Sequence, residues 1–534
     1  MNKILHYMNS VAWIGILAIF TGDVVAKDIQ LTPENIKATW NKIQPGDRVN
    51  FAAGEYRDEL LLLANKPWSV SQPTSFISKT PNAAIVKGSD IVQDWQKLDG
   101  SRYVKDWASE TSQVFVDGVA LKQLGGTVFD GFPENPASTY NNLNKEKGGI
   151  WPGRVAYASN ATMPNDSFFY DRLTKKLYIN TKGDINKRKV EVSVRRRPFY
   201  AEGVSGITLD GLLFEHSNTS ISGRGGAVTI IGNDNVIRNV TVRHTDLAGI
   251  QTVGDRNQLL NSIANYNGQM GVTMRGANNR VIGVEASHNN TRGFNKWWEA
   301  GGFKFVGDGG LHNSEIVNNV AIDNQGDGIW FDWQNKHNLI KGNVAAYNTG
   351  FGIHYELSQF GKIENNYVYG NGQRGIFLRD SANCEISNNM VIANGLEGIV
   401  AVYTGQKDGK GVEFGSENAI VTSNVVGWNT GGALIMPKGA SAIGISDMNV
   451  YLGDDKSTKF SLGYPSTLSP AVYSLSDWQN QSGLDVHSAS SSYGMPKSIL
   501  DSIAKRELIT DWSVIDKVAS PLVKGQAVGP HRNK

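Results

Sequence analysis

The stretch from residue 201 to 440 repeats one short pattern, in which a glycine precedes alternating apolar and polar residues. Three examples are Gly328-Ile329-Trp330-Phe331-Asp332, Gly352-Ile353-His354-Tyr355-Glu356 and Gly375-Ile376-Phe377-Leu378-Arg379, whose glycines lie 24 and 23 residues apart. Alternation without a helical period indicates short strands. Repeats of this length cannot each bury an apolar face alone, so they must stack on one another. The chain is therefore predicted to be all-β and to form a parallel β-helix, with one repeat per coil. A leucine-rich horseshoe would require recurrent leucines, and these are absent.

A second register places asparagine directly before an apolar residue, as in Asn319-Val320, Asn343-Val344 and Asn366-Tyr367. Together the two registers predict two short strands per coil. Asparagine tolerates the left-handed turn conformation and can hydrogen-bond to its stacked copies. We therefore assign these asparagines a structural role and no chemistry.

Composition narrows the function classes. The 52 Lys+Arg residues against 50 Asp+Glu give a net charge of +2, which supplies no basic surface for nucleic acid. The 59 glycines with only 16 prolines fit a turn-rich β protein. Cys384 is the single cysteine, so disulfides within the chain and cysteine-based zinc sites are excluded. No cofactor is expected; a calcium site is conceivable, but no acidic cluster clearly builds one.

The first 26 residues are typical of a secretory signal peptide, with Lys3 before an apolar run from Val11 to Phe20 and cleavage after Ala26. The run is about half the length that spans a bilayer. We therefore expect a periplasmic or extracellular protein with no membrane attachment after cleavage.

The remaining chain divides into four predicted parts. These are an N-terminal cap with the first coils (27–95), an inserted β-sandwich-like domain (96–200), the β-helix with the active-site cleft (201–440), and final coils with a cap (441–534). Helices are expected near Pro33 to Trp40 and near Pro496 to Glu507, the latter closing the C-terminal end. The insertion either narrows the cleft for exo cleavage or docks a second subunit, and the sequence leaves both uses open.

Alternation also predicts which side chains leave the core. Ile329 and Phe331 should face inward, so Asp332 faces outward, and Glu356 takes the same outward position one coil later. Strand spacing of about 4.8 Å would bring the two carboxyl groups roughly 5 Å apart. This is the separation of a retaining glycosidase, about 5–5.5 Å. Like charges directly opposite on neighbouring strands are destabilising, so stability offers no reason for the pair.

Aromatic and charged residues gather around these two acids. Exposed aromatic rings provide rigid surfaces on which sugars can stack. The candidate substrate-binding residues are Trp298, Glu299, Lys304, Trp330, Trp333, His354 and Arg379. The alternative is that the acids and cations form an ordinary solvated face. Asp308 and Asp327 are interpreted as turn residues.

With these motifs, the sequence resembles the right-handed β-helix glycoside hydrolases, in particular the β-xylosidases of glycoside hydrolase family 120. The resemblance rests on Gly328 to Trp333, on Gly352 to Glu356, and on the hairpin segment Ser167-Phe168-Phe169-Tyr170-Asp171. It implies a right-handed solenoid and a retaining mechanism, with Asp332 as the nucleophile and Glu356 as the acid/base.

One observation opposes that division of labour. Arg379 is expected beside Glu356, and a neighbouring cation stabilises an ionised carboxylate, which suits a nucleophile better than an acid. Val306, an apolar residue, is expected beside Asp332.

Two other functions stay open. Lys304, Arg275 and Arg379 on one stripe would suit a polysaccharide lyase or a uronate epimerase, in which a Lys or Arg abstracts the C5 proton and cations or calcium neutralise the uronate. A non-catalytic glycan-binding β-helix would instead spread its aromatic residues along the whole solenoid. In all three cases the partner is a carbohydrate.

Overall fold

The computed structural model of the chain describes residues 26–124, 163–171, 173–219, 225–294, 296–297, 299–307, 309–437, 444–454, 458–463, 471–523 and 527–530. The predicted signal peptide, apart from Ala26, lies outside these residues. So do Trp298 and Asp308. Among the described residues, no helix is long and apolar enough to cross a membrane.

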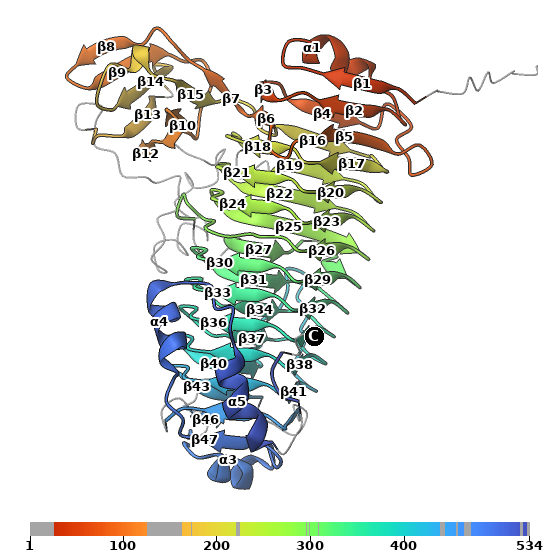
Figure 1. The fold of residues 1–534 in the computed structure, drawn as a ribbon, viewed down its shortest axis with the longest axis vertical. Coiled ribbons are helices and arrows are strands. Elements are labelled where there is room, and N and C mark those ends of the chain that lie inside the picture. Colours follow the sequence, from red (N-terminus) through yellow and green to blue (C-terminus); the bar gives the residue numbers. More distant parts are fainter. Residues whose placement is uncertain are drawn as a thin grey trace, which may run out of the picture.

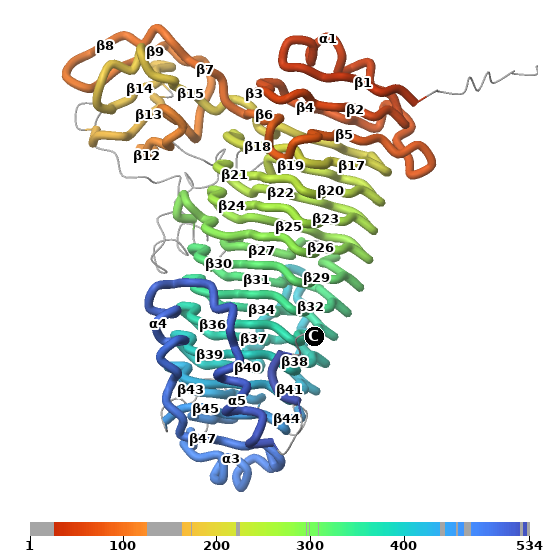
Figure 2. The backbone as a smooth tube through the Cα atoms, viewed as in Figure 1, coloured from red at the N-terminus to blue at the C-terminus, as the bar shows by residue number. Residues whose placement is uncertain are grey.

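Parallel strands stack along one long axis as a β-helix (Figures 1 and 2). Each full coil contributes three strands, so the prediction of two strands per coil was wrong. The overlooked strand has only three residues with one buried side chain, as in β32 (Leu339–Lys341), and this is too short to show a period. After each such strand comes the asparagine register, then the strand that begins at the repeated glycine.

The sheet built from the glycine register is called here the site sheet. Its strands are β4 (Leu60–Leu63), β16 (Phe199–Glu202), β19 (Gly226–Ile231), β22 (Ala248–Val253), β25 (Met270–Ala277), β27 (Gly301–Phe305), β31 (Asp327–Asp332), β34 (Ile353–Glu356), β37 (Ile376–Arg379), β40 (Glu397–Val402), β43 (Gly432–Met436) and β46 (Phe460–Leu462), with β28 (Leu311–His312) paired to β25.

The second sheet contains the overlooked strands. They are β1 (Asp28–Leu31), β2 (Arg48–Phe51), β5 (Thr74–Ser78), β17 (Ile207–Asp210), β20 (Val236–Arg238), β23 (Gln258–Leu260), β26 (Arg280–Ile282), β29 (Glu315–Val317), β32, β35 (Lys362–Glu364), β38 (Glu385–Ser387), β41 (Ile420–Thr422) and β44 (Ile445–Asp447).

The third face consists of two sheets. One is formed by β24 (Ile263–Asn265), β21 (Thr241–Arg243), β18 (Leu213–Glu215), β6 (Ala84–Lys87) and β3 (Gly54–Tyr56). The other is formed by β30 (Val320–Ile322), β33 (Val344–Ala346), β36 (Tyr367–Tyr369), β39 (Met390–Ile392), β42 (Val425–Gly427), β45 (Val450–Leu452) and β47 (Ala489–Ser491).

Buried asparagines form hydrogen-bonded ladders at two of the corners. In one ladder, Asn319 Nδ2 donates to Asn343 Oδ1 at 3.0 Å, and Asn343 Nδ2 donates to Asn366 Oδ1 at 3.0 Å. The structural role predicted for these residues is confirmed. The left-handed conformation, however, belongs to the preceding residues, such as Asn318 and Asn365, with φ of 55° and 58°.

A β-sandwich projects from the N-terminal part of the solenoid (Figure 1). One of its sheets contains β8 (Gln96–Asp99), β9 (Arg102–Asp106), β12 (Lys122–Leu124), β13 (Ser167–Asp171) and β14 (Lys176–Asn180). The other contains β7 (Ser89–Ile91), β10 (Val114–Val116), β11 (Val119–Ala120) and β15 (Val190–Ser193), and the 3-10 helix η4 (Ile185–Lys187) precedes β15. The sheets share an apolar core of their own, which includes Val114, Phe168 and Val192.

Helices cover both ends of the solenoid. At the N-terminal end, α1 (Ile36–Thr39) continues into η1 (Trp40–Lys42), where a capping helix was predicted. At the other end α3 (Leu475–Ser482) inserts Trp478 into the solenoid core. The predicted helix near Pro496 exists as α4 (Lys497–Lys505), but together with α5 (Ser513–Leu522) it packs on the third face and does not close the end.

Candidate active site

The two acids singled out in the sequence occupy neighbouring strands of the site sheet. Asp332 ends β31 and Glu356 ends β34, and their Cα atoms are register partners in this parallel pair. Trp330 and His354 are partners two residues earlier. Isoleucine and aromatic side chains between them point into the core, which fixes the outward direction of all four.

The outward face is not the open surface that the sequence suggested. Trp330 is 6% exposed, His354 3%, Glu356 3% and Lys304 2%. Two insertions between strands contact this side of the sheet. Trp297, in the insertion before β27, packs edge-on against Phe351 at 5.8 Å, and Gly409, after β40, lies against the ring of Trp333. The solvated-face interpretation is therefore wrong for these residues.

Asp332 has one engaged and one unengaged carboxylate oxygen. Its Oδ2 accepts a hydrogen bond from Lys304 Nζ at 2.8 Å. Its Oδ1 is buried and has no hydrogen-bond partner among the described residues. With Val306 as its expected neighbour, Asp332 was predicted to lack a stabilising cation, and this is wrong, because the Lys304 side chain reaches diagonally over the Trp330 ring to Asp332.

Glu356 is held by donors at both oxygens. Its Oε1 accepts from Arg379 Nη1 at 3.0 Å, and its Oε2 accepts from Trp330 Nε1 at 3.1 Å. His354 Nε2 lies 3.6 Å from the same Oε2. Asp332 and Glu356 are thus held by cations on opposite sides, Lys304 one strand before the pair and Arg379 one strand after it. This arrangement offsets the repulsion expected between like charges on adjacent strands.

Asp327 belongs to the same cluster, although its position at a strand start suggested a turn residue. Its Oδ2 lies 3.0 Å from His354 Nδ1, and its Oδ1 accepts from the backbone N–H of Phe351 at 2.8 Å. Burial raises the pKa of Asp327 to about 7 and lowers the pKa of His354 to about 4. His354 is therefore neutral near pH 7, and a chain of polar groups runs from Asp327 through His354 to Glu356. Asp327 lies two residues before the inward Ile329, so alternation gives no signal for its contact with the outward His354.

Aromatic rings fix the orientation of His354. Its ring stacks between Trp330, at a centroid distance of 5.1 Å, and Phe377, at 5.0 Å. Both faces of Trp330 are occupied, by His354 and by Lys304. Trp330 therefore acts on Glu356 through its indole N–H, and it is not a platform for a sugar ring.

The other candidate residues lie around this centre. Trp333 is 37% exposed and has a φ of 62°, an unfavourable backbone conformation for a bulky residue. Arg379 is part exposed beside Glu356. Glu299 lines a separate pocket toward the N-terminus of the site sheet. No group of three or more His, Cys, Asp or Glu side chains suited to a metal ion occurs among the described residues.

Comparisons with known proteins agree with this architecture. A family model described as "Right handed beta helix region" matches residues 226–391 and, in a second match, 300–421. The solenoid is a right-handed parallel β-helix. No curated protein matches the sequence.

Several solved structures are similar in fold. The complex of XylC with xylose has a TM-score of 0.57 and 14% identity, covering 82% of this chain and 86% of that chain. A glycoside hydrolase has a TM-score of 0.46 and 11% identity, covering 86% and 99%. The A-module of the Azotobacter vinelandii mannuronan C-5 epimerase AlgE4 has a TM-score of 0.44 and 13% identity, covering 81% and 90%. At these identities the likeness concerns the fold alone.

Proposed function

We propose that this protein is a retaining glycoside hydrolase, β-xylosidase-like, that cleaves an oligo- or polysaccharide in the periplasm or outside the cell. The observation that carries the proposal is the register pair of Asp332 and Glu356, in which one Asp332 oxygen has no hydrogen-bond partner in the described part of the chain. Adjacent strands supply the short carboxylate separation that a covalent mechanism needs. The fold shared with XylC, which was solved with xylose, is consistent with a sugar substrate.

The geometry supports a double displacement. Asp332 attacks the anomeric carbon through a carboxylate oxygen while Lys304 holds the carboxylate in place, and the bond to the leaving oxygen breaks as Glu356 donates a proton to that oxygen. Glu356, now ionised, takes a proton from water, whose oxygen attacks the same carbon and releases Asp332. Microscopic reversibility requires one residue to act as acid and then as base.

The polar groups around Glu356 can form hydrogen bonds with both its ionised and its protonated form. The ionised form accepts from Arg379 and Trp330. The protonated form can donate to His354 Nε2 when Asp327 is ionised and accepts the proton of Nδ1, since each neutral imidazole has one donor and one acceptor nitrogen. In this proposal Asp327 and His354 are positioning residues that act through Glu356.

A lyase or epimerase is the second candidate, because Lys304 is a buried cation beside the pair. Its ammonium group is already bound to Asp332 Oδ2. A lysine whose amino group is bound to a carboxylate of the pair is not free to accept a proton from carbon, so the hydrolase is favoured. A purely glycan-binding scaffold gives no reason for an unpartnered carboxylate oxygen in a buried pair.

The test is product analysis on neutral xylo-oligosaccharides, fucosylated glycans and uronic-acid polymers with the wild type, Asp332→Asn and Glu356→Gln. Saturated reducing sugar that disappears in both variants is expected, with a rate loss of about 10²–10⁴ for Glu356→Gln. Azide or formate should restore turnover to a variant that lacks the nucleophile. An unsaturated product that survives both substitutions and is lost in Lys304→Ala would make the protein a lyase.

A further inference from the structure

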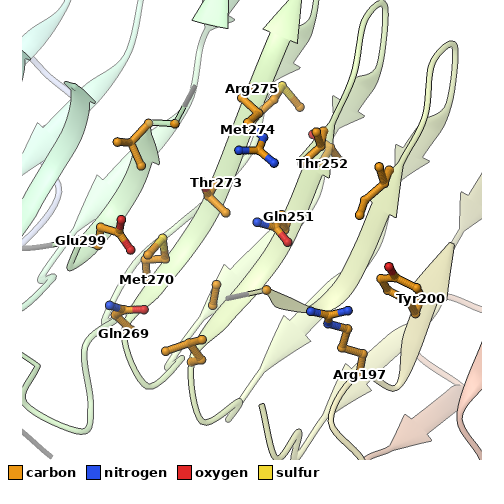
Figure 3. Close-up of a pocket in the computed structure, with 17 residues that line it drawn as sticks. Arg197, Tyr200, Gln251, Thr252, Gln269, Met270, Thr273, Met274, Arg275 and Glu299 are labelled. Atoms are coloured by element: carbon orange, nitrogen blue, oxygen red, sulfur yellow. The ribbon is translucent and has the colours of Figure 1, made fainter. Parts of the chain in front are cut away.

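A second polar pocket lies on the site sheet, N-terminal to the carboxylate pair (Figure 3). It has a volume of about 210 Å³ and is lined by outward side chains of β16, β22 and β25 and by the segment that precedes β27. Pockets for drug-sized ligands begin at roughly 300 Å³. This pocket therefore suits one sugar residue with its substituents rather than a length of polysaccharide.

Arg275 is a cation that lines this pocket. It projects from β25 over the sheet, close to Thr273 and Gln251 in Figure 3. Within the part of the chain that the structure describes, its guanidinium forms no ion pair and no hydrogen bond. Cations that line a cavity without a protein counter-ion are suited to an anionic ligand, and the planar fork of arginine matches a carboxylate.

A buried amide supplies a second, independent indication of a ligand. Gln269 is 1% exposed and lines the pocket, and its Nε2 has no partner among the described residues. An unpaired buried donor costs about 1–3 kcal/mol, so such groups need an explanation. A ligand rich in acceptor oxygens provides one.

The other lining groups are those of a sugar site. Gln251 and Thr273 offer an amide and a hydroxyl, and Tyr200 offers an aromatic ring, over which Arg197 lies with its guanidinium carbon 4.6 Å from the ring centroid. Glu299 also lines the pocket, and a carboxylate can accept hydrogen bonds from sugar hydroxyl groups. The mixture of ring, amide, hydroxyl and cation excludes a purely apolar ligand.

The position of the pocket relates it to the carboxylate pair. Thr273 of β25 pairs with Lys304 of β27, which in turn pairs with Trp330 of β31. Arg275 is therefore two strands before Asp332 on the same face, about 10 Å along the solenoid axis. A saccharide whose scissile bond meets Asp332 and Glu356 would place a neighbouring residue in the pocket.

We propose that this pocket binds a sugar residue that carries a carboxylate, that is a uronic acid, and that Arg275 pairs with the carboxylate. The proposal rests on the proposed function for the neighbouring scissile bond, but the ligand class it names is tested by binding alone. It adds an acidic substituent to a substrate that is otherwise described only as a saccharide.

The test compares a uronic-acid oligosaccharide with its carboxyl-reduced counterpart, which differs only in charge. Calorimetric titrations use protein carrying Asp332→Asn, so that the ligand stays intact, with and without Arg275→Gln. Arg275→Gln is expected to weaken binding of the acidic ligand at least about 10-fold and to change binding of the reduced ligand far less. Arg275→Lys should recover part of the loss, because it keeps the charge without the fork.

The matched control is Arg256→Gln, which removes an arginine paired with Asp234 at an exposed position away from the pocket and should leave both affinities unchanged. Equal affinity of the parent protein for the two ligands, or an equal loss for both in Arg275→Gln, would overturn the proposal. Failure of the hydrolase hypothesis would show differently, as absent turnover with the charge-dependent binding intact. Melting curves of each variant separate lost binding from lost folding.

Discussion

The molecule buries charge in two places, and it treats the charges differently. Where the sandwich meets the solenoid, Lys87 contacts Glu191 at 3.1 Å and Glu215 at 2.8 Å. Arg57 and Arg243 complete these contacts, at 2.8 and 3.0 Å. Burial alone would raise the pKa of Glu191 and of Glu215, but the cations around them hold both pKa values below the ordinary range.

The candidate active site is less completely paired. Among the residues that the structure describes, Asp332 Oδ1 and His354 Nε2 are buried without hydrogen-bond partners, whereas no oxygen of Glu191 or Glu215 is left in that state. Burial also raises the pKa of Asp327 and lowers the pKa of His354, so that the neutral form of each side chain is favoured. The cluster around Lys87, called here the joint, connects the sandwich to the solenoid through fully paired charges. The candidate active site instead leaves two buried polar atoms unpaired among the described residues. Buried charge alone does not mark a functional site; a buried carboxylate that is incompletely paired is the stronger indication.

The largest effect on stability is expected at the joint. Lys87→Met leaves Glu191 and Glu215, which are 1% and 4% exposed, without their shared cation. Breaking a buried pair from one side costs about 3–5 kcal/mol of unfolding free energy. Urea unfolding measures this loss, and Lys362→Met, at a half-exposed lysine, is the control with a much smaller effect. An equal loss in the two variants would remove the distinction between joint and surface.

The next largest effect concerns pH. At about pH 5 the folded Asp327–His354 pair holds one proton, which is on Asp327. In the unfolded chain the same two side chains also hold one proton, which is on the histidine. Because the two states bind equally many protons, the pair makes the free energy of unfolding nearly independent of pH. Asp327→Asn removes the titration of Asp327, which otherwise offsets the effect of the His354 titration on stability. The lowered pKa of His354 then makes stability rise with pH between about 4 and 6.5, by up to about 3 kcal/mol.

Urea unfolding at a series of pH values across that range tests this prediction. Asp106→Asn, at an exposed carboxylate of the sandwich, serves as the control and should leave the profile unchanged. If the free energy of unfolding depends on pH in the same way in the wild type and in Asp327→Asn, then the titration of Asp327 does not offset that of His354, and the prediction is wrong.

A smaller loss of stability is expected from Lys304→Met. Asp332 is 16% exposed at its side chain, so water can reach the carboxylate once the ammonium group is gone. The expected cost is about 1.5–3 kcal/mol. If Asp332 is the nucleophile, as proposed, turnover should fall on the order of 100-fold, because Lys304 no longer holds its carboxylate in place. A stability loss as large as that of Lys87→Met, with full turnover, would make this pair an ordinary structural ion pair.

Trp333 should show the smallest change in stability. Trp333→Gly removes a part-exposed ring but also relieves a positive φ of 62°, so the net change should stay within about 1 kcal/mol. KM should rise several-fold if the ring contacts the sugar. Trp333→Phe retains an aromatic ring and the strained backbone, which separates the two contributions. An unchanged KM in Trp333→Gly would exclude a substrate contact.

Much of this architecture could be predicted from the sequence. The glycine register predicted the stacking of β31, β34 and β37, and the outward direction of Asp332 and Glu356 followed from alternation. Burial of that face could not be predicted, because the insertions that contact it are distant in the sequence and lack a period. Asp327 was missed for a related reason. Its link to His354 is a side-chain contact across strands, and no local pattern records it.

The asparagine ladders continue past both long insertions. Asn289 bonds to Asn324 and Asn389 bonds to Asn424, each across an interval of 35 residues, as evenly as partners 23 residues apart. The backbone on either side of an insertion therefore keeps its register whatever the length of chain between. Evolution, or an engineer, can lengthen or exchange the loops over the site sheet without rebuilding the solenoid, so new ligand preferences can arise on an unchanged scaffold.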